Sequence, residues 1–139
     1  MPHDYTHTVR SFYEAFAHRD NARFVALLDP EIEWTSAESF LYADESPYVG
    51  VGAVCKLIFG RVFDDWDAFS MSPGEILGGG EIVIASGRFR GKFKENGAAI
   101  DAQFVQVFQF KDGRISKCQM YTDTARFKEA ISQIRSGSL

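Results

Sequence analysis

Residues 81–122 read EIVIASGRFRGKFKENGAAIDAQFVQVFQFKDGRISKCQMYT. In this stretch the dipeptides Asn96-Gly97 and Asp112-Gly113 separate three apolar-rich segments, Glu81–Phe93, Ala98–Phe110 and Arg114–Thr122. Asn-Gly or Asp-Gly between apolar segments is the strongest short-range signal for a β-hairpin, because both central residues of a type I′ turn need positive φ. The C-terminal half is therefore predicted to be an antiparallel meander of long strands.

The N-terminal half shows helical periodicity. One face of a helix expected over residues 4–19 carries the apolar side chains of Val9, Phe12, Tyr13, Phe16 and Ala17. A second short helix follows an N-cap at Asp20 and stops at Asp29-Pro30, and a third is expected over residues 51–64. Between them we expect a strand over 31–36 and a loop over 37–49. A further strand over 67–77, interrupted by a turn at Ser72-Pro73-Gly74, leads into the meander, and a short helix from Thr124 closes the chain.

The sequence therefore predicts an α+β fold with helices on one face of a strongly curved antiparallel sheet, enclosing a pocket. Its 139 residues fit a single domain, 1–139. The net charge of −4 gives no electrostatic basis for binding nucleic acid or an anionic membrane. Cys55 and Cys118 lack metal-type spacing and are expected to be free thiols, and there is no signal-peptide or membrane-spanning pattern. We expect a cytoplasmic protein.

Alternation along the strands defines two faces of the sheet. One face of the segment 98–110 carries Ala102, Phe104, Gln106, Phe108 and Phe110, and this face is expected to meet the helices. The opposite face is also partly apolar. An exposed sheet surface carrying Val83, Val105 and Val107 would be a sizeable apolar patch, so a homodimer through that face is predicted.

Five motifs carry a resemblance to a known family. They are Phe12-Tyr13-Glu14-Ala15-Phe16, Pro30-Glu31-Ile32-Glu33-Trp34, Pro47-Tyr48-Val49-Gly50, Asp112-Gly113-Arg114-Ile115 and Tyr121-Thr122-Asp123-Thr124-Ala125. In this order and spacing, over essentially the whole chain, the sequence resembles the nuclear transport factor 2-like superfamily, in its ketosteroid-isomerase-related and SnoaL-like polyketide cyclase branches. The resemblance implies a cone with a bent sheet, an apolar cavity between sheet and helices, and frequent dimers.

The catalytic set of the steroid isomerases does not carry over. Those enzymes use a carboxylate base, and a Tyr with a protonated Asp to stabilise the dienolate. Laid on that pattern, the Tyr position falls at Phe12, with Tyr13 one residue away, the base position at Thr35 and the protonated-Asp position at Gln106. Because Thr is no base near neutral pH and Phe donates no hydrogen bond, isomerisation by that mechanism is not expected.

Several side chains are candidates for contact with a ligand in the cavity. Gln106 needs partners, since an unpaired buried amide costs about 1–3 kcal/mol; it could hold a ligand oxygen, or bond Arg88 or a helix carbonyl. Arg88 could clamp a ligand oxygen, or form an ion pair with Glu33 or Glu38. The hydroxyl of Tyr13 could face the ligand, or the residue could simply pack the helix. The predicted ligand-binding residues are Tyr13, Trp34, Tyr48, Arg88, Phe104, Gln106 and Met120.

Two carboxylates are candidates for proton transfer. Asp123 could be a base at the pocket rim, or it could be the N-cap of the last helix. Glu38 could be a base in the 37–49 loop, or it could be a solvated charge of that loop. The histidines, His3, His7 and His18, all fall near the first helix without a third ligand, so no metal and no cofactor is expected.

Three functions remain open at this point. The first is an enzyme of the isomerase, cyclase or hydratase type that acts on a lipophilic, oxygenated small molecule, and it requires a carboxylate buried in the cavity with a raised pKa. The second is a binding module that holds such a molecule without chemistry, and the third is a dimeric interaction protein. The fold alone does not separate them.

Overall fold

The computed structural model describes residues 4–133 and contains a six-stranded sheet of order β2-β1-β6-β5-β4-β3. The strands are β1 (Leu28–Thr35), β2 (Tyr48–Val49), β3 (Trp66–Gly79), β4 (Ile82–Phe93), β5 (Ala99–Lys111) and β6 (Arg114–Thr122). The four long strands β3 to β6 are antiparallel neighbours, whereas β1 runs parallel to β6 and antiparallel to β2. The predicted meander and the α+β class are therefore confirmed.

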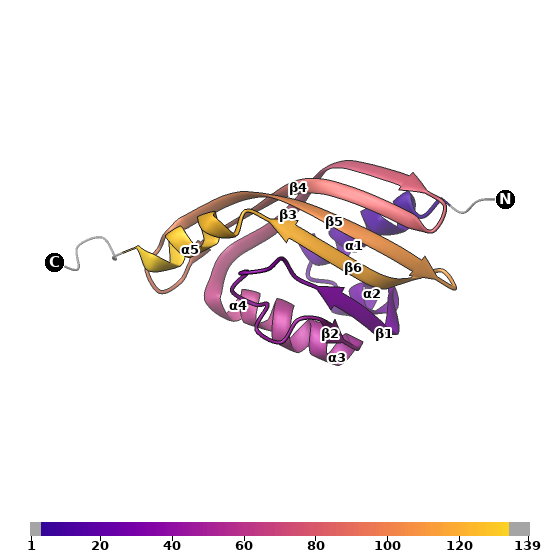
Figure 1. Cartoon of the computed structure of the whole chain (residues 1–139), viewed down its shortest axis with the longest axis horizontal. Coiled ribbons are helices and arrows are strands. Elements are labelled where there is room, and N and C mark those ends of the chain that lie inside the picture. Colours follow the sequence, from indigo (N-terminus) through magenta and orange to yellow (C-terminus); the bar gives the residue numbers. More distant parts are fainter. Residues whose placement is uncertain (1–3, 134–139) are drawn as a thin grey trace.

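The helices are α1 (Thr6–Ala17), α2 (Asn21–Ala26), α3 (Val51–Val54), the π-helical segment η1 (Cys55–Gly60), α4 (Arg61–Asp65) and α5 (Thr124–Ser132). In Figure 1, α1 and α2 lie behind the strands, the continuous stretch from α3 to α4 lies beside β1 and β2, and α5 sits at the far end of the sheet. Asp20 caps α2 as predicted, because its side chain accepts a hydrogen bond from the backbone N–H of Arg23.

The two dipeptides that punctuate the meander behave differently. Asp112 and Gly113 both have positive φ, 51° and 81°, as a type I′ turn requires. At the other hairpin only Gly97 has positive φ, 72°, and the loop is longer than two residues. The side chain of Asn96 instead accepts from the backbone N–H of Ala98 and donates to the carbonyl of Ala130 on α5. The loop at Asn96-Gly97 thus connects the sheet to α5 and is not a tight hairpin turn.

Two expected boundaries are corrected. β1 starts at Leu28, three residues before the expected strand, and continues through Pro30, while α2 already ends at Ala26. β3 also continues through Pro73 and Gly74, where we expected a turn to interrupt it; the register with β4 shifts between Pro73 and Glu75 instead. Such a bulge bends a strand without ending it.

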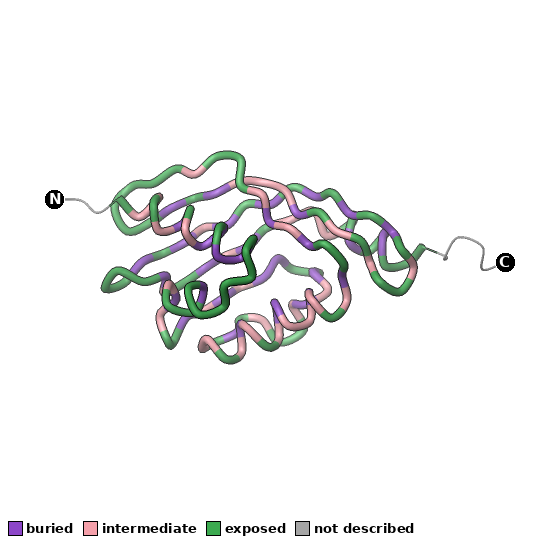
Figure 2. The backbone as a smooth tube through the Cα atoms, turned by 180° about the vertical axis from the view of Figure 1, so that it is seen from behind, coloured by how far each residue is buried: buried purple, intermediate pink, exposed green. Residues whose placement is uncertain are grey.

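The sheet has a buried face and an outer face, as Figure 2 shows by the alternation of buried and exposed segments along the strands. Phe104, Gln106 and Phe108 lie on the buried face, as predicted. Val83 lies there too, opposite Phe108 and fully buried, so its placement on the outer face was wrong. Since Ala85 pairs with Gln106 on the buried face, the exposed large apolar side chains of β4 are instead Ile82 and Ile84.

Among residues 4–133, no helix combines the length and the apolar composition that crossing a membrane requires.

Candidate ligand-binding site

Tyr13 on α1 and Gln106 on β5 form the central polar contact of the interior. The Tyr13 hydroxyl donates to Oε1 of Gln106 over 2.6 Å, and both side chains are buried. Nε2 of Gln106 lies 3.7 Å from the sulfur of Met71, which is only a weak acceptor. Burial raises the pKa of the Tyr13 phenol well above its ordinary value, so the phenol stays protonated and acts as a donor. Within the described part of the chain, the N–H groups of Gln106 therefore lack a strong acceptor.

The phenol that faces Gln106 comes from Tyr13 and not from Phe12, the residue that the resemblance aligns with the isomerase Tyr. Phe12 points toward Phe108 and Trp34, with ring centroids 5.3 and 6.2 Å away, and the neighbouring Tyr13 takes the place facing Gln106. The rotation of α1 about its own axis decides which of the two rings meets the sheet. A phenol thus lies next to Gln106, and Thr35 and Gln106 stand at the positions that the resemblance aligns with the base and the acidic Asp.

Two further polar atoms of the interior have no hydrogen-bond partner among residues 4–133. Nε1 of Trp34 and Oγ of Ser36 are buried and make no hydrogen bond, although the residues are only 2% and 4% exposed. Both residues continue from Ile32 along the buried face of β1 and the segment after it. An unpaired buried donor or acceptor costs about 1–3 kcal/mol, so these atoms favour a bound polar group.

Aromatic rings occupy the space around these polar atoms. Phe104 stacks on Phe89 at a centroid distance of 4.5 Å, and the ring of Tyr13 is 6.1 Å from that of Phe104. Met120 is buried and lies opposite Gln106 in the β5–β6 pairing. Tyr13, Trp34 and Gln106 line none of five pockets found among residues 4–133, so a ligand next to Gln106 requires side chains to move.

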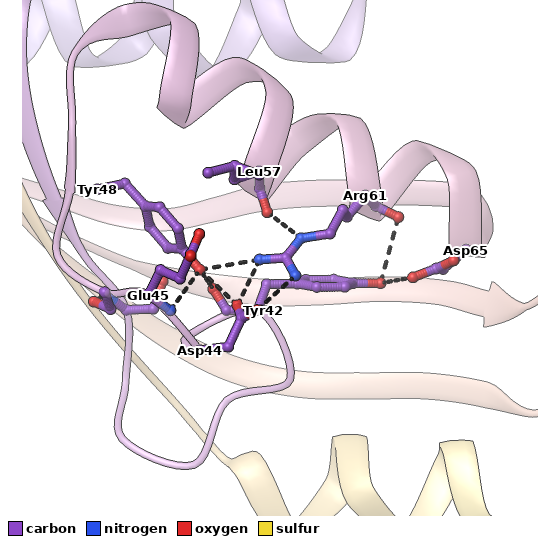
Figure 3. A network of polar contacts seen from close by, with 9 residues as sticks. Tyr42, Asp44, Glu45, Tyr48, Leu57, Arg61 and Asp65 are labelled. Carbon is purple, nitrogen blue, oxygen red and sulfur yellow. Dashed lines mark hydrogen bonds and ion pairs between the residues drawn. The ribbon is translucent and has the colours of Figure 1, made fainter.

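Tyr48 belongs to a different group of contacts, shown in Figure 3. Its ring is buried, while its hydroxyl donates to the carbonyl of Tyr42 and lies 2.8 Å from the carboxylate of Asp44 and 3.0 Å from the guanidinium of Arg61. These contacts fasten the loop between β1 and β2 to α4. The predicted role of Tyr48 as a ligand contact remains a prediction, and its hydroxyl already has partners.

The same group contains residues that the sequence did not single out. The Tyr42 hydroxyl donates to Asp65 over 2.5 Å and accepts from the indole N–H of Trp66, and the Arg61 guanidinium lies 5.1 Å from the centre of the Tyr42 ring. Nothing in the local sequence marks Tyr42, because the loop has no periodicity and its partners lie 19 to 24 residues further along the chain. Ser36, in contrast, could have been found by extending the alternation of Ile32 and Trp34.

Arg88 lies on the outer face of the sheet, opposite Gln103, and therefore cannot meet a ligand beside Gln106. Its guanidinium pairs with Asp101 over 2.5 Å rather than with Glu33 or Glu38. The alternation of β4 against β5 explains the difference: Ala85, not Arg88, shares the face of Gln106.

Asp123 and Arg88 come together in a shallow pocket of about 610 Å³ on the outer face of the sheet, which Phe104 also lines. Asp123 precedes α5 as its N-cap residue, but its side chain caps no backbone N–H and forms an ion pair with Arg126 at 3.4 Å. Glu38 is exposed in the loop after β1. Neither candidate base lies in the interior.

No Asp, Glu or His side chain is buried in the part of the chain that the structure describes; the buried polar residues there are Ser36 and Gln106. Within the same part, no group of three or more His, Cys, Asp or Glu side chains is arranged to hold a metal ion, and His3 lies outside it. The interior thus offers neutral hydrogen-bond donors and acceptors and a large aromatic surface, without an ionisable carboxylate.

The family model of the SnoaL-like domain matches residues 9–118, which is most of the chain. The protein belongs to the SnoaL-like family. No curated protein matches this SnoaL-like chain. Solved structures with the same fold include a nuclear transport factor 2-like protein of Burkholderia thailandensis, 25% identical over 92% of this chain and 97% of that one, with a TM-score of 0.87.

Two further solved structures place the SnoaL-like chain among varied relatives. A nuclear transport factor 2-like protein of unknown function from Burkholderia pseudomallei is 26% identical, covers 94% of this chain and 100% of its own, and has a TM-score of 0.84. A protein of Xanthomonas campestris described as a candidate polyketide cyclase is 18% identical over 91% of this chain and 96% of its own, with a TM-score of 0.80, and this likeness shows the fold alone.

Proposed function

We propose that this SnoaL-like protein binds a small lipophilic molecule with a carbonyl or hydroxyl oxygen in the interior of the cone, without acid–base chemistry. The observation that carries the proposal is the Tyr13–Gln106 pair, buried among aromatic rings with the amide N–H groups of Gln106 left without a strong acceptor. A ligand oxygen that accepts from this amide would satisfy its N–H groups, once side chains have moved to admit the ligand.

The indole N–H of Trp34 supports the same chemistry. It is a donor only, it is buried, and it has no acceptor among the described residues. The donors of Trp34 and Gln106 come from strands separated by β6 alone. A molecule with oxygens at two positions of an aromatic or alicyclic skeleton would match both donors and the rings between them.

Binding rather than catalysis is proposed because the interior has no base. A proton transfer by Asp123 or Glu38 would need a carboxylate in contact with the bound molecule, and both lie outside the interior. The raised pKa of Tyr13 also keeps its phenol from acting as a base at neutral pH.

A matched series of bicyclic compounds tests the proposal. Naphthalene, 2-naphthol and 2-acetylnaphthalene have similar apolar surfaces and differ in the oxygen, and quenching of tryptophan fluorescence would report their affinities. We expect both oxygenated compounds to bind the wild-type protein about tenfold more tightly than naphthalene, in line with one buried hydrogen bond.

Two substitutions in the pair and one outside it complete the test. Gln106→Met keeps the side-chain volume and removes the amide, so it should abolish the preference for the oxygenated compounds. Tyr13→Phe leaves Oε1 of Gln106 without its donor and should reduce that preference. Tyr121→Phe removes a hydroxyl from the exposed outer face and should change nothing. Equal affinity for all three compounds in the wild type, or an unchanged preference in Gln106→Met, would contradict the proposal.

We also propose a homodimer through the outer face of the sheet. Ile84, Val105 and Tyr121 are 44%, 36% and 55% exposed on this face. Val105 lies directly opposite Tyr121, and Ile84 lies opposite Val107, two residues further along β5. Arg88, Arg90 and Asp101 adjoin them and form ion pairs within this face, so a second copy could meet it with both charge signs matched. In such a dimer the pocket of Arg88 and Asp123 would face the partner.

A further inference from the structure

A second apolar pocket lies between the helices, separate from the interior next to Gln106. It has a volume of about 360 Å³, and its walls are the rings of Phe16, Phe24, Phe59 and Phe63 from α1, α2, η1 and α4. Small-molecule pockets typically range from about 300 to 1,000 Å³ and are lined mostly by apolar and aromatic side chains. The pocket is therefore of the size and composition that fit a small ligand.

The π-helical segment η1 shapes this pocket. Its widened turns place Cys55 and Gly60 as well as Phe59 at the pocket wall. A Cβ atom at Gly60 would lie 3.2 Å from the carbonyl oxygen of Cys55, so a side chain here would crowd the turn. π-Helical turns inside longer helices are frequent at functional sites.

Arg19 places a positive charge at the pocket. Its guanidinium carbon lies 4.7 Å from the centre of the Phe16 ring and 4.5 Å from that of Phe63, and it donates to the carbonyls of Phe16 and Phe69 over 2.6 and 2.8 Å. These two bonds use two of its five N–H groups. Between residues 4 and 133, no carboxylate forms an ion pair with Arg19, in contrast to Arg23, Arg61, Arg88, Arg90 and Arg126.

Four contacts orient this cation, although Arg19 is an exposed residue. Two ring contacts and two carbonyl bonds hold the guanidinium, and Arg19 itself has a φ of 56°, which is uncommon for a residue other than glycine. A preorganised guanidinium with free N–H groups next to an apolar pocket is complementary to a carboxylate attached to an apolar group.

We propose that this pocket binds an amphipathic monocarboxylate, with its alkyl or aryl part against the four phenylalanine rings and its carboxylate on Arg19. The pocket has a different lining from the proposed interior site, because Tyr13, Trp34 and Gln106 do not line it, although the Phe59 ring packs on Trp34 at a centroid distance of 5.4 Å.

Cys55 provides a local reporter for the test. It lines the pocket and is half-buried, whereas Cys118 is buried in the core and should react only when the protein unfolds. Alkylation by iodoacetamide, followed at each cysteine by mass spectrometry of peptides, measures the accessibility of Cys55 with Cys118 as an internal check of folding. The probes are octanoate and, as its neutral counterpart, octan-1-ol.

In the wild-type protein we expect octanoate to slow alkylation of Cys55, and octan-1-ol to do so only at about tenfold higher concentration. Arg19→Met should remove this difference. Arg23→Met is the matched control, because Arg23 is a neighbouring exposed arginine that does not line the pocket, and it should keep the difference. Tyr13→Phe should keep it as well, which separates this site from the interior.

A second variant covers the case in which Arg19→Met fails to fold. Val25 is 39% exposed at the pocket, so Val25→Trp should fold and should block octanoate by filling the space. The proposal is overturned if octanoate does not slow the reaction of Cys55 in the wild type, if octan-1-ol protects equally well, or if Val25→Trp leaves protection unchanged.

Discussion

Asp44 is an exposed carboxylate whose two oxygens are held by a single arginine. Nη1 and Nη2 of Arg61 donate to them over 3.2 and 2.7 Å, and the hydroxyl of Tyr48 also lies within hydrogen-bond distance. These contacts hold the pKa of Asp44 well below its ordinary value, and the hydrogen bonds from Arg61 contribute most to this shift. The ionised form is therefore the form that fastens the loop between β1 and β2 to α4.

This shift predicts a pH dependence with a definite sign. Because the pKa of Asp44 is lower in the folded than in the unfolded protein, its contribution to stability is present above about pH 4 and is lost as the pH falls further. Between pH 6 and pH 3, the melting temperature of Asp44→Asn should fall by less than that of the wild-type protein. Asp64→Asn, an exposed aspartate on α4, serves as control and should fall as the wild type does; parallel losses in all three proteins would contradict the prediction.

At the same scale, alternation of side chains located Gln106 but not its partner. The pattern of Phe104, Gln106 and Phe108 fixes a face because the period of a strand is exactly two. The choice between Phe12 and Tyr13 depends on how α1 rolls against the sheet, which neighbouring apolar residues leave undetermined. The place of Arg88 was not predictable for a related reason. Its face depends on the register between β4 and β5, and the sequence of one strand does not contain that register.

The hairpin of β3 and β4 depends on Gly87, which lies on the buried face where the two strands bend. A Cβ atom there would lie 2.8 Å from Cζ of Phe104 and 2.9 Å from Cα of Pro73, and would also clash with the carbonyl oxygen of Ser72. Glycine therefore allows Phe104 to lie across β4 and stack on Phe89.

Gly87→Ala is predicted to destabilise the protein by about 1–3 kcal/mol or more, because backbone and ring must both shift. Gly79→Ala is a matched control at the end of β3, where a Cβ atom would meet nothing within 4 Å, and should cost less than about 0.5 kcal/mol. Urea denaturation of the two variants measures the difference, and equal stabilities would show that the strands relax around the added methyl group.

Elements of the fold were predictable where a local rule decides them. The meander follows from turn dipeptides and alternation, and the cap at Asp20 follows from residue type. The passage of β1 through Pro30 and of β3 through Pro73 could not be predicted, because an edge or bulged position tolerates proline and the sequence does not reveal which positions those are.

At the scale of the whole molecule, the proposed dimer makes the outer face of the sheet testable. Val105 lies on β5 between Ser86 and Tyr121 on the neighbouring strands and is partly exposed, so Val105→Lys should leave the fold intact. Under twofold symmetry each substitution places two lysines at the interface, and we expect association to weaken by about tenfold or more in sedimentation velocity experiments. Val49→Lys, at an exposed position on β2, should leave it unchanged. A wild-type protein that is monomeric at all concentrations would refute the dimer.

The parallel pairing of β1 with β6 also determines when the sheet can form during synthesis of the chain. Leu28 and Trp34 align with Ile115 and Cys118, more than eighty residues later. On a ribosome, β1 emerges early and then has to wait for the last strand of the sheet, so the nascent chain exposes the indole of Trp34 and its neighbours throughout most of synthesis. We therefore expect the sheet to close only after β6 has been synthesised, and slowly, as chains dominated by distant contacts do.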